Sequence, residues 1–328
     1  MNVYAADLSA IRAAAERIQG GVHQTPVLTC SALDALAKRS LFFKCENLQK
    51  IGAFKMRGAL NAVMSLSEEA AARGVVTHSS GNFAQAVALA AKTRGVPAYI
   101  VMPQTAPEVK RRAVEGYGAE ITMCVPTLEA RETTAAEVGA RTGATFLHPY
   151  DQAEVIAGQG TVALELVEQV QDLDAVLVPV GGGGLISGIT LALRELAPHV
   201  RVFAVEPHGA DDAARSKAAG EHILQTAPNT IADGLLTSLG ELTWPVVRDL
   251  VEEVLLVDDA EITAAMRLIW ERMKIVVEPS AATVLAATLQ PEFLAREGLG
   301  RLGLVLSGGN VDLTKLPWGR ESPASQGG

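Results

Sequence analysis

The stretch V-P-V-G-G-G-G-L-I-S-G, residues 178–188, decides the fold. It starts inside an apolar run, residues 175–180, and passes through four consecutive glycines into a helix-forming segment. Because glycine has no Cβ, the N–H groups of such a loop can surround a phosphate at the start of a helix. The letters fit neither the G-x-G-x-x-G nor the G-x-x-x-x-G-K-[ST] nucleotide motif. The stretch therefore predicts a phosphate site where a buried strand ends, with a plain tight turn as the alternative.

The apolar run belongs to a series of short runs that alternate with Ala-rich helical segments. Helical spacing is clearest in residues 83–93 and 261–273, where apolar side chains recur on one face. Alternation of this kind predicts an α/β fold in which mostly parallel sheets are flanked by helices. The predicted strands are residues 41–45, 75–78, 98–102, 120–124, 175–180, 201–205, 253–257 and 303–306.

Length, charge and cysteine content narrow the class of protein. The chain has 328 residues, which corresponds to about two domains. A net charge of −9 without a basic run argues against a nucleic-acid partner. Three cysteines far apart in the sequence favour free thiols in a reducing compartment over a disulfide framework. Apolar runs are too short to span a membrane, so we expect a cytoplasmic protein.

Two more segments carry candidate chemistry. In I-G-A-F-K-M-R-G-A, residues 51–59, Lys55 stands between apolar neighbours, and desolvation would lower its pKa and free its amine to attack a carbonyl. An ordinary surface lysine is the alternative. In T-H-S-S-G-N-F, residues 77–83, a strand leads into a helix through a turn whose N–H groups could bind a carboxylate. The alternative is that these residues only form an N-cap.

A fourth segment, V-L-S-G-G-N-V-D at residues 305–312, again leads from a strand into glycines. Ser307 at this strand end could hydrogen-bond a ring nitrogen, or only stabilise a turn. In this order, the lysine, the S-G-N turn, the tetraglycine loop and S-G-G-N resemble the β-family (fold type II) of pyridoxal-phosphate enzymes. The chain is most similar to serine racemases and short threonine/serine dehydratases, and H-Q-T-P-V-L-T (23–29) and V-E-P-S-A-A (277–282) extend the match.

The resemblance implies a two-lobed fold like that of the tryptophan synthase β subunit. Residues 1–49 plus 147–318 would form a large cofactor-binding domain, and residues 50–146 a small mobile domain. Residues 319–328 would be a disordered tail, and the protein a homodimer acting on a small amino acid.

The resemblance also assigns site residues. Lys55 would hold pyridoxal 5'-phosphate covalently, with Phe54 and Asn82 beside it and Ser307 facing the pyridine nitrogen. Ser80 is implied as a second catalytic group, because serine racemases use the matching serine on the face of Cα opposite the lysine. The phosphate would be held by Gly181, Gly182, Gly183, Gly184 and Leu185, and the substrate carboxylate by Ser79, Ser80 and Gly81.

Departures from these relatives concern the substrate. Phe83 stands where a histidine is usual, and Tyr150-Asp151 resembles the H-P-F-D of threonine dehydratases, whereas Arg131 matches a serine racemase position. We therefore expect an ammonia-lyase that converts threonine, serine or a β-aryl serine to a 2-oxo acid and ammonia. The alternatives are a serine racemase with side elimination and a non-catalytic amino-acid sensor.

The segment E-P-H-G-A-D-D, residues 206–212, matches a divalent-cation site of serine racemases. By that resemblance the ligands are Glu206, the carbonyl of Ala210, and Asp212. Oxygen ligands suit Mg²⁺ or Ca²⁺. A solvated acidic loop is the alternative.

Overall fold

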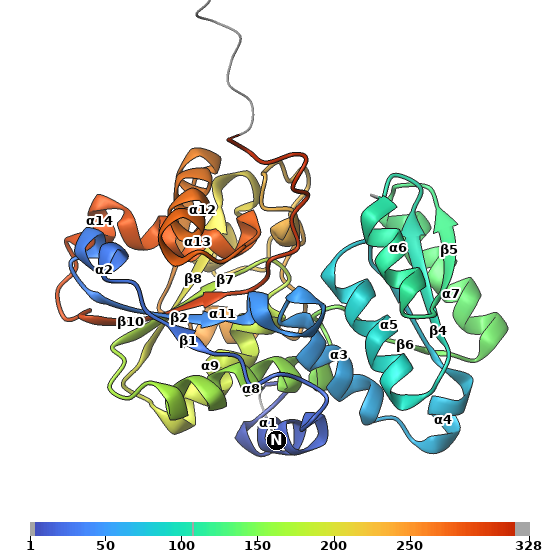
Figure 1. Ribbon diagram of the computed structural model, residues 1–328. Coiled ribbons are helices and arrows are strands. Elements are labelled where there is room, and N and C mark those ends of the chain that lie inside the picture. The colour runs from blue at the N-terminus through green and yellow to red at the C-terminus, as the bar shows by residue number, and fades with distance from the viewer. Residues whose placement is uncertain (1–3, 107, 319–328) are drawn as a thin grey trace, which may run out of the picture.

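The computed structural model describes residues 4–106 and 108–318, and its strands form two separate sheets (Figure 1). The larger sheet is parallel except for its first strand, which pairs antiparallel to the second. Its central strand β7 is buried at every residue, as expected for a parallel strand covered on both faces. The order is β1 (Val27–Leu28), β2 (Ser40–Cys45), β10 (Arg301–Leu306), β7 (Ala175–Pro179), β8 (Arg201–Pro207) and β9 (Glu253–Val257).

Helices cover both faces of this sheet, each over its own apolar core (Figure 1). One face carries α2 (Ser31–Ala37), α12 (Asp259–Met273) and α13 (Pro279–Leu289). The other carries α1 (Leu8–Ile18), α8 (Ala153–Gln169), α9 (Gly184–Leu196) and α11 (Trp244–Leu250). The remaining short elements are η1 (Glu46–Leu48), η2 (Lys50–Gly52), η3 (His208–Ala210), α10 (Asp212–Ala219), η4 (Asp233–Leu235) and α14 (Pro291–Leu294).

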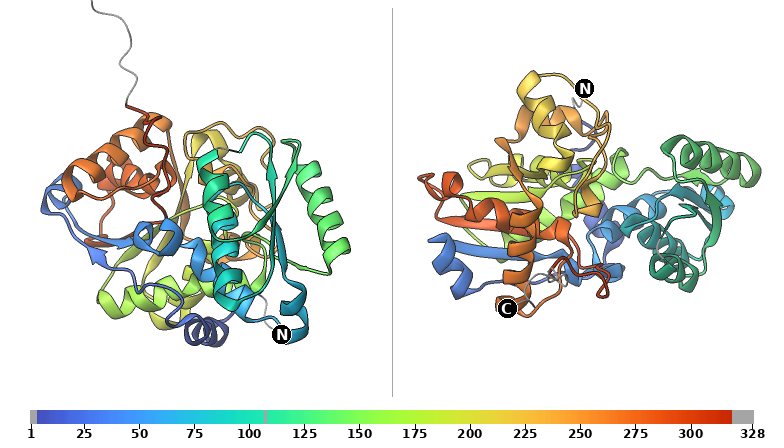
Figure 2. Two further views of the ribbon diagram at one scale, coloured as in Figure 1. Left: turned by 45° about the vertical axis from the view of Figure 1, so that its right-hand side comes forward. Right: turned by 90° about the horizontal axis from the view of Figure 1, so that it is seen from above.

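The smaller sheet has four parallel strands in the order β5 (Glu120–Cys124), β4 (Ala98–Pro103), β3 (Val75–His78) and β6 (Thr145–Phe146). Helices α3 (Lys55–Met64), α5 (Asn82–Arg94) and α6 (Glu108–Gly116) lie on one side, and α4 (Glu68–Arg73) lies near β6. Among the described elements, helix α7 (Leu128–Thr142) is the one that covers the other face, and it is the green helix at the right edge of the left-hand view in Figure 2. The asymmetry leaves part of that face open.

The predicted α/β class is confirmed, and all eight predicted strands are present with ends shifted by two residues at most. Strands β1 and β6 were missed because two residues are too few to show a period. The strands of the smaller sheet fall within residues 50–146, but α3 packs against α8 as well as α5. The tail at 319–328 lies outside the described residues. Across the described residues, no helix has both the length and the apolar character needed to cross a membrane.

Candidate active site

Lys55 is the first residue of α3, and its position is tied to the end of β10. Ala53 forms an antiparallel bridge with Gly308, and the Phe54 N–H donates to the Ser307 carbonyl at 3.0 Å. Lys55 and Ser307, 252 positions apart in the sequence, are thereby brought to one place. Ser307 is almost fully buried at the carboxyl end of the strand. The hydrogen bond to α3 uses the carbonyl of Ser307 and not its hydroxyl.

The amine of Lys55 lies among aromatic rings. Its Nζ is 5.0 Å from the centre of the Phe54 ring, 5.8 Å from that of Phe83 and 6.0 Å from that of Tyr150. Nζ also donates to the Pro149 carbonyl at 2.9 Å. Burial lowers the pKa of this lysine to about 8, although a nearby carboxylate opposes the shift. The amine is therefore much closer to its nucleophilic form at neutral pH than a surface lysine is.

Asn82 begins α5, and its side-chain amide links the smaller sheet and its helices, here called the smaller lobe, to the larger sheet and its helices, the larger lobe. Its Nδ2 donates to both carboxylate oxygens of Glu278, at 3.0 and 3.2 Å, and its Oδ1 accepts from Asn310 Nδ2 at 2.9 Å. The Asn310 backbone N–H donates to Glu278 at 3.1 Å. The same carboxylate is the one that raises the pKa of Lys55. Glu278 thus has two effects: it holds the Asn82 amide in place, and it favours the charged form of Lys55.

The turn before α5 is shaped by its own polar groups. The Ser79 N–H donates to the Val101 carbonyl at 3.1 Å, and the Gly81 N–H donates to Ser79 Oγ at 3.3 Å. Gly81 is the N-cap of α5 and offers no side chain to its first N–H groups. Ser80 is half-buried within this turn. Free N–H groups at a helix start favour a carboxylate ligand.

The tetraglycine loop joins β7 to α9, and close packing explains two of its glycines. A Cβ on Gly182 would lie 2.2 Å from the Tyr150 ring, and a Cβ on Gly183 would lie 2.7 Å from Thr243. Gly183 also has a φ of +84° and caps α9 without a side chain. The first N–H groups of this helix are therefore open to an anion.

Phe83 contacts the lysine from the protein interior, whereas Arg131 and Leu185 make their contacts elsewhere. Phe83 is 2% exposed and belongs to the apolar core of the smaller lobe, so its ring supports the lysine from within the protein. Arg131 lies on α7, where its Nε donates to the Thr127 carbonyl at 3.3 Å and its charge lowers the pKa of His78. Leu185, in the first turn of α9, is buried in the core of the larger lobe.

The three residues predicted to bind a metal run from the end of β8 to the start of α10: Glu206 is in β8, Ala210 ends η3, and Asp212 begins α10. Both Glu206 oxygens accept backbone N–H groups, from Ala213 at 3.1 Å and Ala214 at 3.0 Å. Burial, with the neighbouring negative charge, raises the pKa of Glu206 to about 9, and burial raises that of Asp212 to about 6. Within the described ranges, the buried Asp212 Oδ1 has no hydrogen-bond partner. A cation would satisfy such an oxygen, so these residues and the Ala210 carbonyl fit a hard divalent ion.

Among the described residues, no three or more His, Cys, Asp or Glu side chains are grouped so that they could hold a metal ion. The predicted set has two carboxylates and one carbonyl, so it would not form such a group.

Glu278 and Asn310 were missed as site residues. A signal for the first existed, because Glu278 followed by Pro279 is a pattern typical of a helix start, and the structure begins α13 there. Nothing local revealed that this N-terminus meets α5 of the other lobe, because that contact spans 196 positions.

Comparison with known proteins identifies the family. A family model described as "Pyridoxal-phosphate dependent enzyme" matches residues 18–308. The chain is 52% identical to a serine racemase of Dictyostelium discoideum, covering 94% of this chain and 96% of that one. It is 53% identical to a β-hydroxyaspartate dehydratase of Paracoccus denitrificans, covering 93% and 96%. The structure of maize serine racemase superposes with a TM-score of 0.94, at 51% identity and 95% coverage of both chains.

The chain belongs to the family of pyridoxal-phosphate dependent enzymes. Its site fits that cofactor on two structural grounds. A half-buried amine with a lowered pKa suits an aldehyde, and the uncapped, glycine-lined start of α9 suits a phosphate.

Proposed function

We propose that the protein is a serine racemase that also eliminates water from its substrate. The observation that carries the proposal is Ser80, placed in the turn that starts α5, in a chain about half identical to serine racemases over nearly its whole length. This proposal reverses the expectation from the sequence, which was an ammonia-lyase with racemisation as the alternative. The dehydratase reaction that Tyr150 and Asp151 favoured becomes the side reaction, and racemisation the main one.

The cofactor would be held by residues of both lobes. Lys55 would bind its aldehyde carbon, Gly181 to Gly184 with Leu185 its phosphate, and Ser307 its ring nitrogen, with Phe54 and Asn82 alongside. Pyridoxal phosphate, when bound, withdraws electrons from the substrate Cα and so makes its proton acidic. The protein's own part is to bind, orient and exchange protons.

Proton transfer would use two side chains. Lys55, as the free amine, removes the Cα proton, and the Ser80 hydroxyl returns one from the other face, which is what inversion requires. The N–H groups at the start of α5, with Ser79, Ser80 and Gly81, hold the substrate carboxylate. When the β-hydroxyl leaves as water before a proton returns, hydrolysis of the product gives a 2-oxo acid and ammonia.

Replacing Ser80 tests this division of labour. Ser80→Ala is expected to lose at least about 100-fold in racemisation, the usual contribution of a proton-transfer group, while elimination continues. Chiral chromatography of serine and assay of pyruvate measure the two reactions separately. Lys55→Ala should lose both reactions. Racemisation undiminished in Ser80→Ala would exclude the second proton-transfer role.

A second candidate is dehydration of 3-hydroxyaspartate, favoured by the relative that carries that name. The aromatic rings of Phe54 and Tyr150 beside Lys55 oppose it, because a second carboxylate needs a cation. Comparing kcat/KM for serine, threonine, phenylserine and 3-hydroxyaspartate separates the candidates. A clear preference for the diacid would replace the serine proposal.

A further inference from the structure

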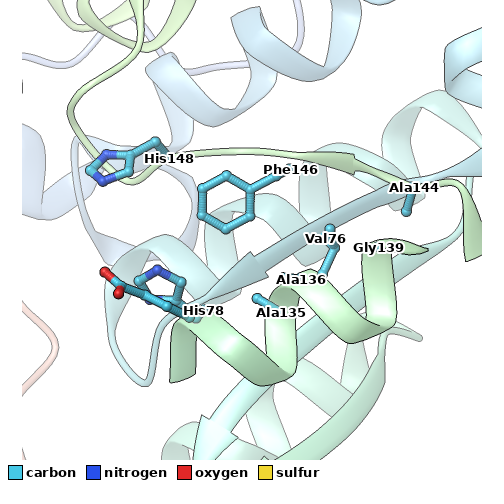
Figure 3. Close-up of a pocket in the computed structure, with 9 residues that line it drawn as sticks. Val76, His78, Ala135, Ala136, Gly139, Ala144, Phe146 and His148 are labelled. Atoms are coloured by element: carbon cyan, nitrogen blue, oxygen red, sulfur yellow. The ribbon is translucent and has the colours of Figure 1, made fainter. Parts of the chain in front are cut away.

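A cavity of about 480 Å³ lies in the smaller lobe, between α7 and strands β3 and β6 (Figure 3). It exists because one helix covers this face of the sheet, and that helix presents Ala135, Ala136 and Gly139 there, which are too small to fill the space. Phe146, on the opposite wall, is 41% exposed. The volume lies within the range of small-molecule sites, about 300–1,000 Å³.

The lining selects a particular chemistry. Figure 3 shows Phe146 and His148 across the cavity from the helix that carries Ala135 and Ala136, with His78 between them. His78 and Phe146 stack with ring centres 5.5 Å apart. Burial lowers the pKa of both histidines, that of His148 to about 4, and so disfavours the charged form of both rings.

Among the residues that line the cavity, the one with a formal charge is a glutamate. Glu132 lines the cavity and is exposed. Its neighbour Arg131 acts on His78 but does not line the cavity. Apolar walls, an open aromatic ring and a carboxylate together suit a molecule with an apolar body and a positive charge.

His148, which lines the cavity, also contacts the turn that binds the Lys55 amine. Its Nδ1 accepts the N–H groups of Asp151, at 2.8 Å, and Tyr150, at 3.4 Å, and so shapes the turn that contains Pro149. The Pro149 carbonyl accepts the Lys55 amine. The His148 ring also meets the Tyr150 ring edge-on, with centres 4.6 Å apart. Displacement of His148 would therefore act on the lysine.

We propose that this cavity is a second ligand site, distinct from the substrate site, that takes a small organic cation with an aromatic or aliphatic body. Its occupation acts on Lys55 through the turn that His148 shapes. A regulator is the role that fits this occupant, because the contact from the cavity to the Lys55 amine runs through His148 and the Pro149 carbonyl.

The probe is benzyltrimethylammonium, which has no N–H and cannot react with the cofactor. Calorimetry on the cofactor-loaded protein measures binding, and the visible absorbance of the lysine-bound cofactor reports coupling. Neither readout depends on which amino acid the enzyme converts, so failure here leaves the racemase proposal standing. We expect saturable binding of the cation, weaker binding of benzyl alcohol and none of benzenesulfonate.

Two variants locate the site. Ala136→Leu fills the cavity from an exposed helix position and should weaken binding about tenfold or more. Glu132→Gln should weaken it about two- to fivefold, as expected for an exposed charge pair. The matched controls Ala140→Leu and Glu137→Gln, exposed on the same helix but outside the cavity, should leave affinity unchanged.

Several outcomes would overturn the proposal. They are no binding of the cation, equal affinity in wild type and Ala136→Leu, or tighter binding of benzenesulfonate. Binding that leaves the absorbance unchanged would refute the coupling to Lys55.

Discussion

Lys55 shows how burial changes one residue's chemistry. Its amine lies among three aromatic rings with a carbonyl as its hydrogen-bond acceptor, and burial lowers its pKa to about 8. At pH 7 about a tenth of such amines are neutral, against less than about a thousandth for an ordinary lysine. The neutral form is the one that attacks an aldehyde.

Uptake of pyridoxal phosphate by cofactor-free protein should therefore accelerate as pH rises through about 8, then level off. Stopped-flow absorbance measures the rate. Between pH 8 and the ordinary lysine pKa the unfolded chain binds more protons than the folded one. Lys55 should consequently make the free energy of unfolding of the cofactor-free protein rise with pH over that interval.

Glu278 supplies the matched check on this profile. Because its charge raises the pKa of Lys55, Glu278→Gln should move the midpoint of uptake below that of the wild type. Glu137→Gln, an exposed carboxylate on α7, should leave it in place. A midpoint above 10 in the wild type would contradict the effect of burial on Lys55.

At the scale of elements, the loop between β7 and α9 depends on the absence of side chains. A methyl group at residue 182 would overlap the Tyr150 ring. Gly182→Ala should therefore weaken binding of pyridoxal phosphate, because either the loop or the ring must move. Fluorescence titration of cofactor-free protein measures the dissociation constant.

The controls for this variant follow from the same geometry. Gly116→Ala meets open space, so it should bind the cofactor normally. Tyr150→Ala combined with Gly182→Ala should recover part of the lost affinity if the overlap is the cause. Wild-type affinity in the single variant would show that the loop accepts a Cβ.

The segment from the end of β8 to the start of α10 leads to a separate prediction, which concerns binding of a metal ion. Asp212 Oδ1 is buried without a hydrogen-bond partner in the described part of the chain, and Glu206 lies beside it. Treatment with a chelator should lower Tm, and Mg²⁺ or Ca²⁺ should restore it. Asp212→Asn should remove this response, while Asp211→Asn should keep it. A Tm insensitive to both chelator and added ion would exclude the site.

At the scale of the molecule, a buried ion network joins the lobes. Arg57 of α3 is fully buried and pairs with Glu46 of η1 at 2.7 Å and with Glu165 of α8 at 2.6 Å, and Lys44 of β2 pairs with the same Glu165 at 2.6 Å. Removing one member of the network would leave the remaining buried charges without a partner of opposite charge. This network fixes the base of α3, the helix that carries Lys55.

Arg57→Met should lower the free energy of unfolding by about 3–5 kcal/mol, the range for a broken buried ion pair. Denaturant unfolding monitored by circular dichroism measures the change. Arg73→Met, which breaks the exposed pair with Glu69, should change it by less than about 1 kcal/mol. A loss of that small size at Arg57 would mean that the network contributes little.

Division of the chain into residues 1–49 plus 147–318 and residues 50–146 remains a prediction, as does the mobility of the smaller part. The homodimer is also a prediction, which light scattering would test. Helix α3 bears on the division because it packs on α5 of one lobe and α8 of the other.

The sequence by itself determined the α/β class, the strand positions and the glycine loop. These depend on local periodicity and on residues close together in the chain. The family too could be inferred from ordered motifs, and comparison confirmed it.

Only the tertiary structure decided which residues surround the amine of Lys55. Tyr150 and Glu278 act on this amine, and the Ser307 carbonyl binds the N–H of the neighbouring Phe54. These three residues come from three distant segments, and no local pattern indicates that they converge. The cavity under α7 has the same origin, since it arises from one helix covering a four-stranded face. Local chemistry selects the elements, and their packing creates the site.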